Sequence, residues 1–520
     1  MRQGPQRMTD LTLTSLGANT DADSLYAEAQ AAMEAGDMAR ATLLLTRAAE
    51  LAPTRDDLHG DLGFALETQG DYDGARAAYA EAIRLAPDVA VHHYNLGAAC
   101  QALGMAHEAA VHYVDAIERE PLLAEAYFNL GTLFFEAGHL DVAIQHYKNA
   151  LVARPTYAEA AGNLALTYRR MGVMEGAVEW YRAALALRPE LAVSHLNLGI
   201  VLGETGRHEE AVAELRHALQ IEPRNLSALV HLSFSLRGLG QPERAAEEAL
   251  AALAIDPDHA GAHVELGQTA AALQAAGKGQ QVQGLVARWR MAAGDHPILR
   301  HTAAALGLEK APDRADGAYV EQLFDASARR FDETVQGLDY RVPALIREAL
   351  ATYAGTPAAD REVLDAGCGT GLAGEALRPY ARQLRGVDLS MGMIEIAAAR
   401  RIYDELEQAE LVGWLAARPA AFDIAVMGDV LCYFGDLGGP VGALAGALNT
   451  HGLGILTVEA AEPWAAPFTL RESGRYTHRR DYVEQALKTA GLAMLELRST
   501  TLRQEGGQPV EGILAVVRKA

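Results

Sequence analysis

The feature that most constrains the fold is a proline that recurs at a constant interval along the first half of the chain. The prolines that keep this spacing are Pro53, Pro87, Pro121, Pro155, Pro189, Pro223 and Pro257. Each one ends an amphipathic stretch, because proline has no amide hydrogen and cannot continue a helical hydrogen-bond ladder. A fixed period of this length indicates a repeat architecture, in which each unit buries its apolar face against its neighbours.

Other positions repeat in the same register. Four units carry a Leu-Gly pair in their first half, at 62–63, 96–97, 130–131 and 198–199. Six units carry a small residue in their second half, at Ala75, Ala109, Ala143, Ala177, Ala211 and Ala245. Small side chains let two antiparallel helices approach closely, so each unit is predicted to be a helical hairpin. The length, the Leu-Gly pair and the terminal proline resemble the tetratricopeptide repeat (TPR) family, which implies an all-α superhelix of seven repeats over residues 22–259.

The period fails after Pro257, and the next proline follows only at Pro297. The end of a stacked array must expose a polar outer face, so residues 260–297 are predicted to form a degenerate helical hairpin that caps the stack. Residues 1–21 are expected to be a flexible leader. The charged, proline-containing composition within residues 298–318 predicts an exposed linker.

Four repeats carry asparagine at one shared position, just before the Leu-Gly or Leu-Ala pair. These residues are Asn95, Asn129, Asn163 and Asn197. The TPR resemblance implies that this position faces the concave groove, where a carboxamide can both donate to and accept from an extended peptide backbone. The row is therefore a candidate binding site for a protein or peptide partner. The alternative is that asparagine is simply common at this position of the repeat.

A glycine-rich turn marks a different module nearer the C-terminus. The segment EVLDAGCGTG begins as a short apolar strand and leads into a helical pattern. Strand, glycine turn and helix together predict a nucleotide-binding element, since glycines let the backbone approach a ligand and a helix N-terminus presents free N–H groups. Gly367, Gly369 and Gly371 depart from the dinucleotide fingerprint, which would place glycine where Leu372 stands. A second strand ends in Asp388, whose carboxylate can accept both ribose hydroxyls of an adenosine.

Four segments in order, VLDAGCGTG, GVDLSMGMIEIA, FDIAVMGDVLCYF and LGILTVEA, resemble class I S-adenosylmethionine-dependent methyltransferases. The whole chain also resembles the bacterial family of predicted methyltransferases that carry TPR repeats. The resemblance implies that residues 319–520 form an α/β, Rossmann-like methyltransferase domain. Its sheet is expected to have seven mostly parallel strands, one antiparallel strand near the edge and helices on both faces.

The resemblance also assigns residues to the cofactor, S-adenosylmethionine. The implied cofactor-binding residues are Asp365, Gly367, Cys368, Gly369, Gly371, Asp388, Leu389, Met393, Glu410, Leu411 and Asp429. Asp365 and the glycine turn would hold the amino-acid end, and Asp388 would bind the ribose, with two apolar residues after it packing near the adenine. Glu410 and Leu411 match the position that recognises the adenine amine. Asp429 would lie beside the sulfonium, or it is purely structural.

Aromatic and titratable residues near these motifs are candidates for the remaining roles. Tyr319, Phe331 and Tyr340 would close over the cofactor, or they belong to the core. A hydroxyl or amine acceptor must lose a proton, and a base for this step is predicted among three residues in loops next to the motifs. These candidate catalytic residues are Tyr433, Tyr476 and His478. His478 is equally compatible with a surface position.

Charge and composition exclude some classes of function. The formal net charge of −23 repels phosphate backbones, so no nucleic acid partner is expected. No stretch approaches the roughly 18 to 20 apolar residues that cross a bilayer, so a cytoplasmic protein without membrane insertion is expected. The three cysteines lie far apart, and no His, Asp or Cys residues show ligand spacing, so no metal is predicted.

Three functions remain open from the sequence. The first is a methyltransferase whose repeats recruit a protein or a polymer-linked acceptor. The second is a methyltransferase of small molecules or glycan precursors whose TPR repeats anchor it to a complex. The third is a non-catalytic scaffold whose methyltransferase domain only senses the cofactor. Intact Asp365, Asp388, Asp429 and the glycine turn argue against the third.

Overall fold

The computed structural model describes residues 21–328, 331–505 and 507–520. The chain divides into two compact units, Met1–Pro223 and Arg224–Ala520. The expected leader, residues 1–21, lies outside the described residues except for Asp21, which caps the first described helix. Among the described residues, no helix combines the length and the apolar character needed to span a membrane.

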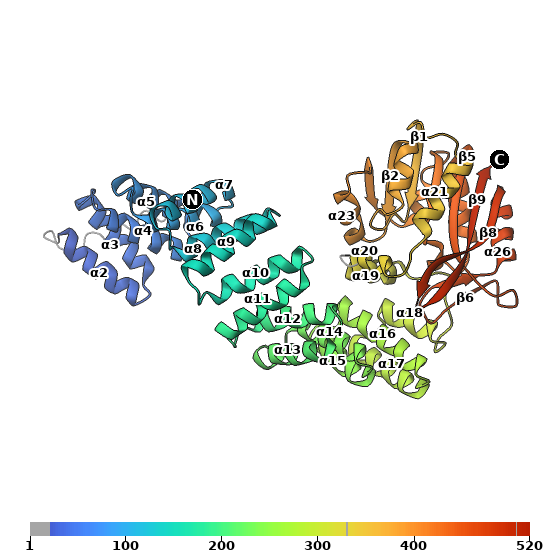
Figure 1. The fold of residues 1–520 in the computed structure, drawn as a ribbon, viewed down its shortest axis with the longest axis horizontal. Helices are drawn as coiled ribbons and strands as arrows, with labels where there is room; N and C mark the ends of the chain where they lie inside the picture. Colours follow the sequence, from blue (N-terminus) through green and yellow to red (C-terminus); the bar gives the residue numbers. More distant parts are fainter. Residues whose placement is uncertain (1–20, 329–330, 506) are drawn as a thin grey trace, which may run out of the picture. The chain divides into compact units, whose positions relative to one another are not determined.

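The described part of the first unit consists of consecutive helical hairpins (Figure 1). Its helices are α2 (Ala22–Glu34), α3 (Met38–Leu51), α4 (Asp56–Thr68), α5 (Tyr72–Leu85), α6 (Ala90–Ala102), α7 (Ala106–Arg119), α8 (Ala124–Glu136), α9 (Leu140–Ala153), α10 (Ala158–Arg170), α11 (Met174–Leu187), α12 (Ala192–Glu204) and α13 (His208–Ile221). The second helix of each hairpin ends two residues before a periodic proline, as α5 does before Pro87. The residue before proline is driven out of the helical region, which explains this common end point.

The Leu-Gly pair has a packing reason. A side chain added at Gly97 would begin 2.8 Å from the ring of Tyr113, which is fully buried in the facing helix. A side chain at Gly131 would begin 2.9 Å from Tyr147 in the same way. In these hairpins the missing side chain of the glycine leaves room for the tyrosine ring of the facing helix. This close packing of ring against glycine holds the two helices together.

The second unit begins with helices that continue the hairpin pattern. They are α14 (Leu226–Gly238), α15 (Pro242–Ile255), α16 (Ala260–Ala275), α17 (Gly279–Ala293) and α18 (Pro297–Ala305). α16 and α17 occupy the segment that was predicted to cap the array. Between them, the buried indole of Trp289 donates a hydrogen bond of 2.8 Å to Nδ1 of His263.

Residues 298–318 match the predicted exposed linker only in their second part: most of residues 307–318 are exposed, whereas the first part is a packed helix. α18 fills the first part of this segment and buries most of its side chains, including His301. Nε2 of His301 lies 2.8 Å from the carbonyl oxygen of Gly474, and the hydroxyl of Tyr476 donates to the carbonyl of Pro312 over 2.7 Å. α18 and the carbonyl of Pro312 therefore contact the C-terminal domain. Local composition does not predict these contacts, because the partners are distant in sequence.

The C-terminal domain is built on one sheet of nine strands. They are β1 (Arg361–Ala366), β2 (Ala381–Asp388), β3 (Glu405–Gln408), β4 (Phe422–Met427), β5 (Leu448–Ala460), β6 (Phe468–Leu470), β7 (Tyr476–His478), β8 (Leu492–Glu505) and β9 (Gln508–Lys519). β3, β2, β1, β4 and β5 are parallel in that order, and β9 lies antiparallel between β5 and the edge strand β8. This arrangement confirms the predicted mostly parallel α/β fold, but among the described residues the sheet has nine strands rather than seven, and both β9 and β6 run antiparallel to the others. The small β6–β7 hairpin, which pairs with the end of β5, was not predicted.

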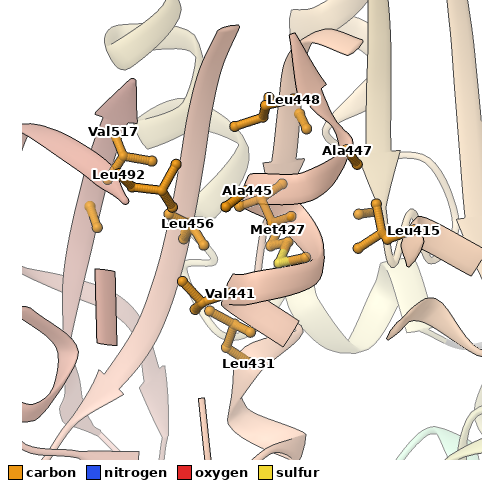
Figure 2. Close-up of a cluster of buried hydrophobic side chains, with 14 of the residues drawn as sticks. Leu415, Met427, Leu431, Val441, Ala445, Ala447, Leu448, Leu456, Leu492 and Val517 are labelled. Carbon is orange, nitrogen blue, oxygen red and sulfur yellow. The ribbon is translucent and has the colours of Figure 1, made fainter. Parts of the chain in front are cut away.

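Helices cover both faces of the sheet (Figure 1). The helices of the domain are α19 (Gly317–Ser327), α20 (Phe331–Gln336), α21 (Val342–Tyr353), α22 (Gly374–Leu377), α23 (Met391–Ala399), α24 (Leu411–Ala416), α25 (Gly438–Ala447) and α26 (Arg480–Thr489), with 3-10 turns η2 (Arg378–Tyr380) and η3 (Leu431–Tyr433). α21 packs on the face that carries Val363 and Ile424. α24, α25 and α26 pack on the other face, where Val441 and Ala445 of α25 meet Met427 (Figure 2).

Candidate functional site

A cavity opens at the ends of the parallel strands, where the sequence placed its motifs. Carboxyl ends of parallel strands meet at one edge of a sheet, which is where α/β domains bind ligands. Among the predicted cofactor-binding residues, those that line the cavity are Asp365, Gly367, Cys368, Gly369, Asp388, Leu389, Met393, Glu410, Leu411 and Asp429. These residues follow four different strands, β1 to β4, so the fold brings together segments that are well separated in the chain.

The turn after β1 owes its shape to its glycines. Gly367, Gly369 and Gly371 have φ angles of +75°, +52° and +89°, a region that residues with side chains rarely adopt. A side chain at Gly367 would collide with Val430, whereas a side chain at Gly369 would meet no atom within 4 Å. Gly367 is therefore required by packing, and Gly369 leaves the backbone bare beside the cavity. Gly371 does not belong to the lining.

Asp388 connects the end of β2 to the glycine turn. Its Oδ2 accepts a hydrogen bond from the amide of Gly369 over 2.8 Å, and its Oδ1 accepts one from the amide of Ser390 over 2.9 Å. Burial raises the pKa of Asp388, and these backbone hydrogen bonds oppose the rise. Each carboxylate oxygen has a second lone pair, so Asp388 can hold the turn and still accept from a ligand.

Asp365 is the most deeply buried acid in the cavity wall, with 2% of its surface exposed. Burial raises its pKa to about 6, although the hydroxyl of Tyr403 donates to its Oδ2 over 2.6 Å and opposes that rise. No cation pairs with Asp365 among the ion pairs of the described residues. An ammonium group in the cavity would supply the counter-charge that this carboxylate lacks.

Asp429 is held in a buried network of charges. It follows β4 with a φ of +59°, and its amide donates to the hydroxyl of Thr457. Nη1 of Arg475 lies 3.2 and 3.1 Å from its two carboxylate oxygens, and Arg503 approaches to 3.6 Å. Burial opposes the ionisation of Asp429, but the two arginines outweigh it and lower its pKa. Glu459 pairs with both arginines, at 3.2 and 2.6 Å.

Arg475 is a cavity residue that sequence reasoning missed. It precedes β7 and lines the cavity beside Tyr433, with its guanidinium carbon 5.8 Å from the centre of that ring. The segment SGRYTHRRDYV contributed to the family resemblance, but nothing in the spacing separates Arg475 from Arg479 and Arg480. Its role depends on contact with Asp429, a residue 46 positions earlier in the chain.

Aromatic side chains form another wall of the cavity. Tyr340, Phe331 and Tyr433 line it, together with Phe324 of α19. The ring of Phe324 meets Tyr433 edge-on at 5.5 Å between centres and Phe331 at 6.0 Å. Burial raises the pKa of Tyr433 well above its usual value, so its hydroxyl stays protonated at neutral pH. Tyr433 is therefore placed to donate a hydrogen bond rather than to remove a proton.

Three residues that were predicted for this site are engaged elsewhere. The hydroxyl of buried Tyr476 donates to a backbone carbonyl, and Nε2 of His478 lies 2.8 Å from the carbonyl oxygen of Phe434. Burial lowers the pKa of His478 to about 4. Tyr319 stacks on the imidazole of His301 at 3.9 Å between ring centres. None of the three belongs to the described cavity lining. The positions of Tyr476 and His478 therefore do not support the predicted role as a base.

The asparagine row of the first unit is partly buried along its whole length. Nδ2 of Asn129 lies 3.2 Å from the hydroxyl of Tyr113 and 3.4 Å from that of Tyr94 in the preceding hairpin. Asn163 has a side-chain hydrogen bond with Tyr147. These carboxamides therefore connect neighbouring helices, and their role in binding a partner stays a prediction.

Comparison with known proteins agrees with a chain of helical repeats followed by an α/β domain. A family model described as a methyltransferase domain matches residues 338–497, and tetratricopeptide repeat models match residues 32–100, 94–158 and 156–224. The chain joins tetratricopeptide repeats to a methyltransferase domain. The methyltransferase match includes every strand from β1 to β7 and most of the cavity lining.

Individual relatives match only part of the chain. Methyltransferase-like protein 27 of Homo sapiens is 39% identical over 92 residues, which cover 18% of this chain and 38% of that protein. Trans-aconitate 2-methyltransferase of Pseudomonas aeruginosa is 39% identical over 99 residues, 18% of this chain and 35% of the enzyme. The matches thus span a little over a third of these relatives. Among solved structures, MamA has 27% identity and a TM-score of 0.30, covering 31% of this chain and 95% of MamA.

Proposed function

We propose that this protein is an S-adenosylmethionine-dependent methyltransferase whose TPR array recruits a protein or a polymer-linked acceptor. The observation that carries the proposal is the cavity at the ends of β1 to β4, which gathers the buried carboxylate of Asp365, the partly buried carboxylate of Asp388 and a bare glycine turn. The methyltransferase-domain match over residues 338–497 supports the same activity. Bound S-adenosylmethionine supplies an electrophilic methyl group on a sulfonium.

The residues present fit this cofactor. Asp365 lacks a cation partner among the described ion pairs, which suits the ammonium group of an amino acid. Asp388 has free lone pairs beside the cavity, which suits ribose hydroxyls. The open space beside Gly369 allows close approach of the backbone to a ligand, and Leu389 and Met393 offer apolar surface for an adenine.

The chain itself then has to place the acceptor and exclude water. The aromatic wall of Phe324, Phe331, Tyr340 and Tyr433 supplies an apolar surface for this purpose. Holding the reacting groups in line can lower the activation free energy by about 7 to 11 kcal/mol. The protonated hydroxyl of Tyr433 is available to orient an acceptor by donating a hydrogen bond. The proposal names no protein base, and the proton that a hydroxyl or amine acceptor loses would pass to solvent.

Recruitment by the repeats is supported by the length of the array. Repeat models match residues 32–224, and stacked helical repeats create extended surfaces that bind proteins or peptides. The proposed acceptor is therefore a macromolecule, captured away from the cavity and presented to it.

A small anionic acceptor is the second candidate, and one observation favours it. Arg475 and Arg314 both line the cavity, and guanidinium groups bind carboxylates. Arg475 is already paired with Asp429 and Glu459, and Arg314 with Glu410, so an anionic acceptor would share these guanidinium groups with the protein's own carboxylates. A relative of this domain is named as a methyltransferase of trans-aconitate, a small carboxylate. On this alternative the repeats only anchor the enzyme in a complex.

The first test is a calorimetric titration of the full chain with S-adenosylmethionine, with NADH as the control ligand. The proposal expects micromolar binding of S-adenosylmethionine and none of NADH. Absence of S-adenosylmethionine binding would overturn the methyltransferase proposal and favour a scaffold function. Transfer of a labelled methyl group to the protein fraction or the small-molecule fraction of a lysate would then separate the two acceptor classes.

A further inference from the structure

A cluster of metal-binding side chains lies in the third hairpin of the repeat array. His93 on α6 and His112 and Asp115 on α7 bring three ligand atoms within 4.8 Å of one another. His93 is 4% exposed, and the other two residues are half-buried. No other group of this kind occurs among residues 21–328, 331–505 and 507–520.

The partners of His93 determine which of its nitrogens faces the cluster. Its Nε2 lies 3.0 Å from the carbonyl oxygen of Pro87. A carbonyl can only accept, so Nε2 carries the hydrogen of the neutral ring and Nδ1 presents a lone pair. This Nδ1 is buried and has no hydrogen-bond partner, and the same holds for Nδ1 of His112.

Asp115 is oriented by Arg119, which contacts the carboxylate oxygen that lies away from the two histidines. Nη1 of Arg119 lies 3.3 Å from its Oδ1, while Oδ2 lies 3.6 Å from Nδ1 of His93 and 3.8 Å from Nδ1 of His112. Nε of Arg119 also donates to the carbonyl of Pro87, over 2.6 Å. Outer partners that hold imidazole and carboxylate ligands in this way are typical of protein metal sites.

Two of the three distances between the ligand atoms suit a tetrahedral ion, and the third, between the two imidazole nitrogens, is within 4.8 Å. With bonds of about 2.0 to 2.1 Å to nitrogen and oxygen, neighbouring ligands of Zn²⁺ lie roughly 3.3 to 3.4 Å apart. Both distances to Oδ2 of Asp115 exceed this value by only a few tenths of an ångström. Nδ1 of His93 and the carboxylate of Asp115 face each other without a hydrogen bond between them, and Nδ1 of His112 beside them has no hydrogen-bond partner. With the hydrogen of His112 on its Nε2, a cation at the centre would stabilise all three groups.

The sixth hairpin carries a histidine at the same position, but there the second ring nitrogen is in direct contact with a carboxylate. His195 occupies the position of His93, and its Nε2 lies 2.8 Å from the carbonyl oxygen of Pro189. Its Nδ1 lies only 2.6 Å from Oε2 of Glu214, a direct contact that needs a hydrogen on Nδ1 as well as on Nε2. In the third hairpin no such direct contact forms, which leaves the space between the ligand atoms open.

We propose that His93, His112 and Asp115 bind one divalent transition-metal ion, with Zn²⁺ as the best match to two imidazoles and a carboxylate. The ion ties α6 to α7 and leaves a fourth position for water. The site lies entirely within the first unit and is independent of the proposed methyltransferase activity.

The test uses the full chain, stripped of metal with a chelator and titrated with ZnCl₂ in a calorimeter. The wild-type protein is expected to bind one more equivalent of zinc than the variants Asp115→Asn and His112→Ala. Removal of the outer contact in Arg119→Gln is expected to weaken that equivalent about 10- to 100-fold.

The matched control is His146→Ala. His146 occupies the position of His112 in the next hairpin and also has an unpartnered Nδ1, but Asn149 stands where Asp115 would be. This variant is expected to keep the zinc equivalent. Circular dichroism confirms that each variant is folded. Equal zinc stoichiometry in wild type, Asp115→Asn and His112→Ala overturns the proposal and leaves an imidazole–carboxylate ion pair in its place.

Discussion

At the scale of single residues, Asp388 has two tasks that a substitution can separate. It accepts hydrogen bonds from two backbone amides and retains lone pairs for a ligand. Asp388→Asn keeps the size of the side chain but removes its charge and one acceptor. Loss of one hydrogen bond to a charged group costs about 1.5 to 3 kcal/mol, so the Kd for S-adenosylmethionine is expected to rise about 10- to 100-fold. Calorimetry of this variant beside Asp404→Asn, which lies outside the described cavity lining, provides the comparison; equal affinities would mean that the ribose contact is misassigned.

A second prediction at this scale concerns the pH dependence of stability. The pKa of Asp365 is raised to about 6 in the folded protein from an ordinary value of 3.8, because the carboxyl group is buried. Its favourable contribution is thus full below about pH 4 and is lost as pH rises through 6. At 1.4 kcal/mol per unit, the loss amounts to about 3 kcal/mol at most. Asp365→Asn is expected to remove this slope and to raise the urea-unfolding midpoint at pH 7 in the absence of cofactor.

Asp404 is a control, because its pKa is shifted in the opposite direction to that of Asp365. Despite some burial, the amide of Leu384 and the guanidinium of Arg378 lower the pKa of Asp404. Its contribution to stability is therefore present above the unfolded pKa and is lost as pH falls. Asp404→Asn is expected to lower the unfolding midpoint at pH 7. Parallel changes in Asp365→Asn and Asp404→Asn would contradict the assignment of Asp365 as a carboxylate that burial destabilises.

At the scale of elements, two glycines of the turn between β1 and α22 are expected to have different roles: Gly367 is needed for packing, and Gly369 for access of the ligand to the backbone. Gly367→Ala places a side chain against Val430 at a φ of +75°, so it is expected to destabilise the domain by about 1 to 3 kcal/mol. Gly369→Ala meets no protein atom and is expected to fold with a cost of about 1 to 2 kcal/mol. Its new methyl group points into the open space beside the cavity, so cofactor affinity is expected to fall at least 10-fold. Thermal unfolding and calorimetry of both variants check this division; unchanged affinity in Gly369→Ala would mean that the ligand does not approach the turn.

The elements that could be predicted from the sequence are those that a local pattern determines. Each repeat is one hairpin whose small residues and terminal proline recur in every period, and the glycine turn and Asp388 lie next to the strands that position them. The β6–β7 hairpin has only three residues in each strand, which is too short for a pattern of alternation. Arg475 and the packing of α18 depend on tertiary contacts between distant parts of the chain, which no local pattern encodes. The cluster of His93, His112 and Asp115 leaves no ligand spacing in the sequence, because one of these residues comes from a different helix than the other two.

At the scale of the whole molecule, the unit that contains the methyltransferase domain begins well before the motifs do. Arg224–Ala520 forms one compact unit, in which α19 contacts both α16 and α18. A fragment of residues 319–520 follows the domain boundary that the sequence predicted, but it leaves the carbonyl of Gly474 without His301 and the buried hydroxyl of Tyr476 without Pro312.

Each such unpaired group costs about 1 to 3 kcal/mol, and each kcal/mol lowers the melting temperature of a domain of this size by roughly 2 to 4 °C. The fragment 319–520 is therefore expected to melt at least about 5 °C below the fragment 224–520 in a thermal unfolding measurement. A third fragment that starts at Pro297 restores α18 and both hydrogen bonds, and it is expected to recover most of the difference. If 319–520 melts at the same temperature as 224–520, the terminal helices are an independent cap, and the functional domain begins where the sequence pattern placed it.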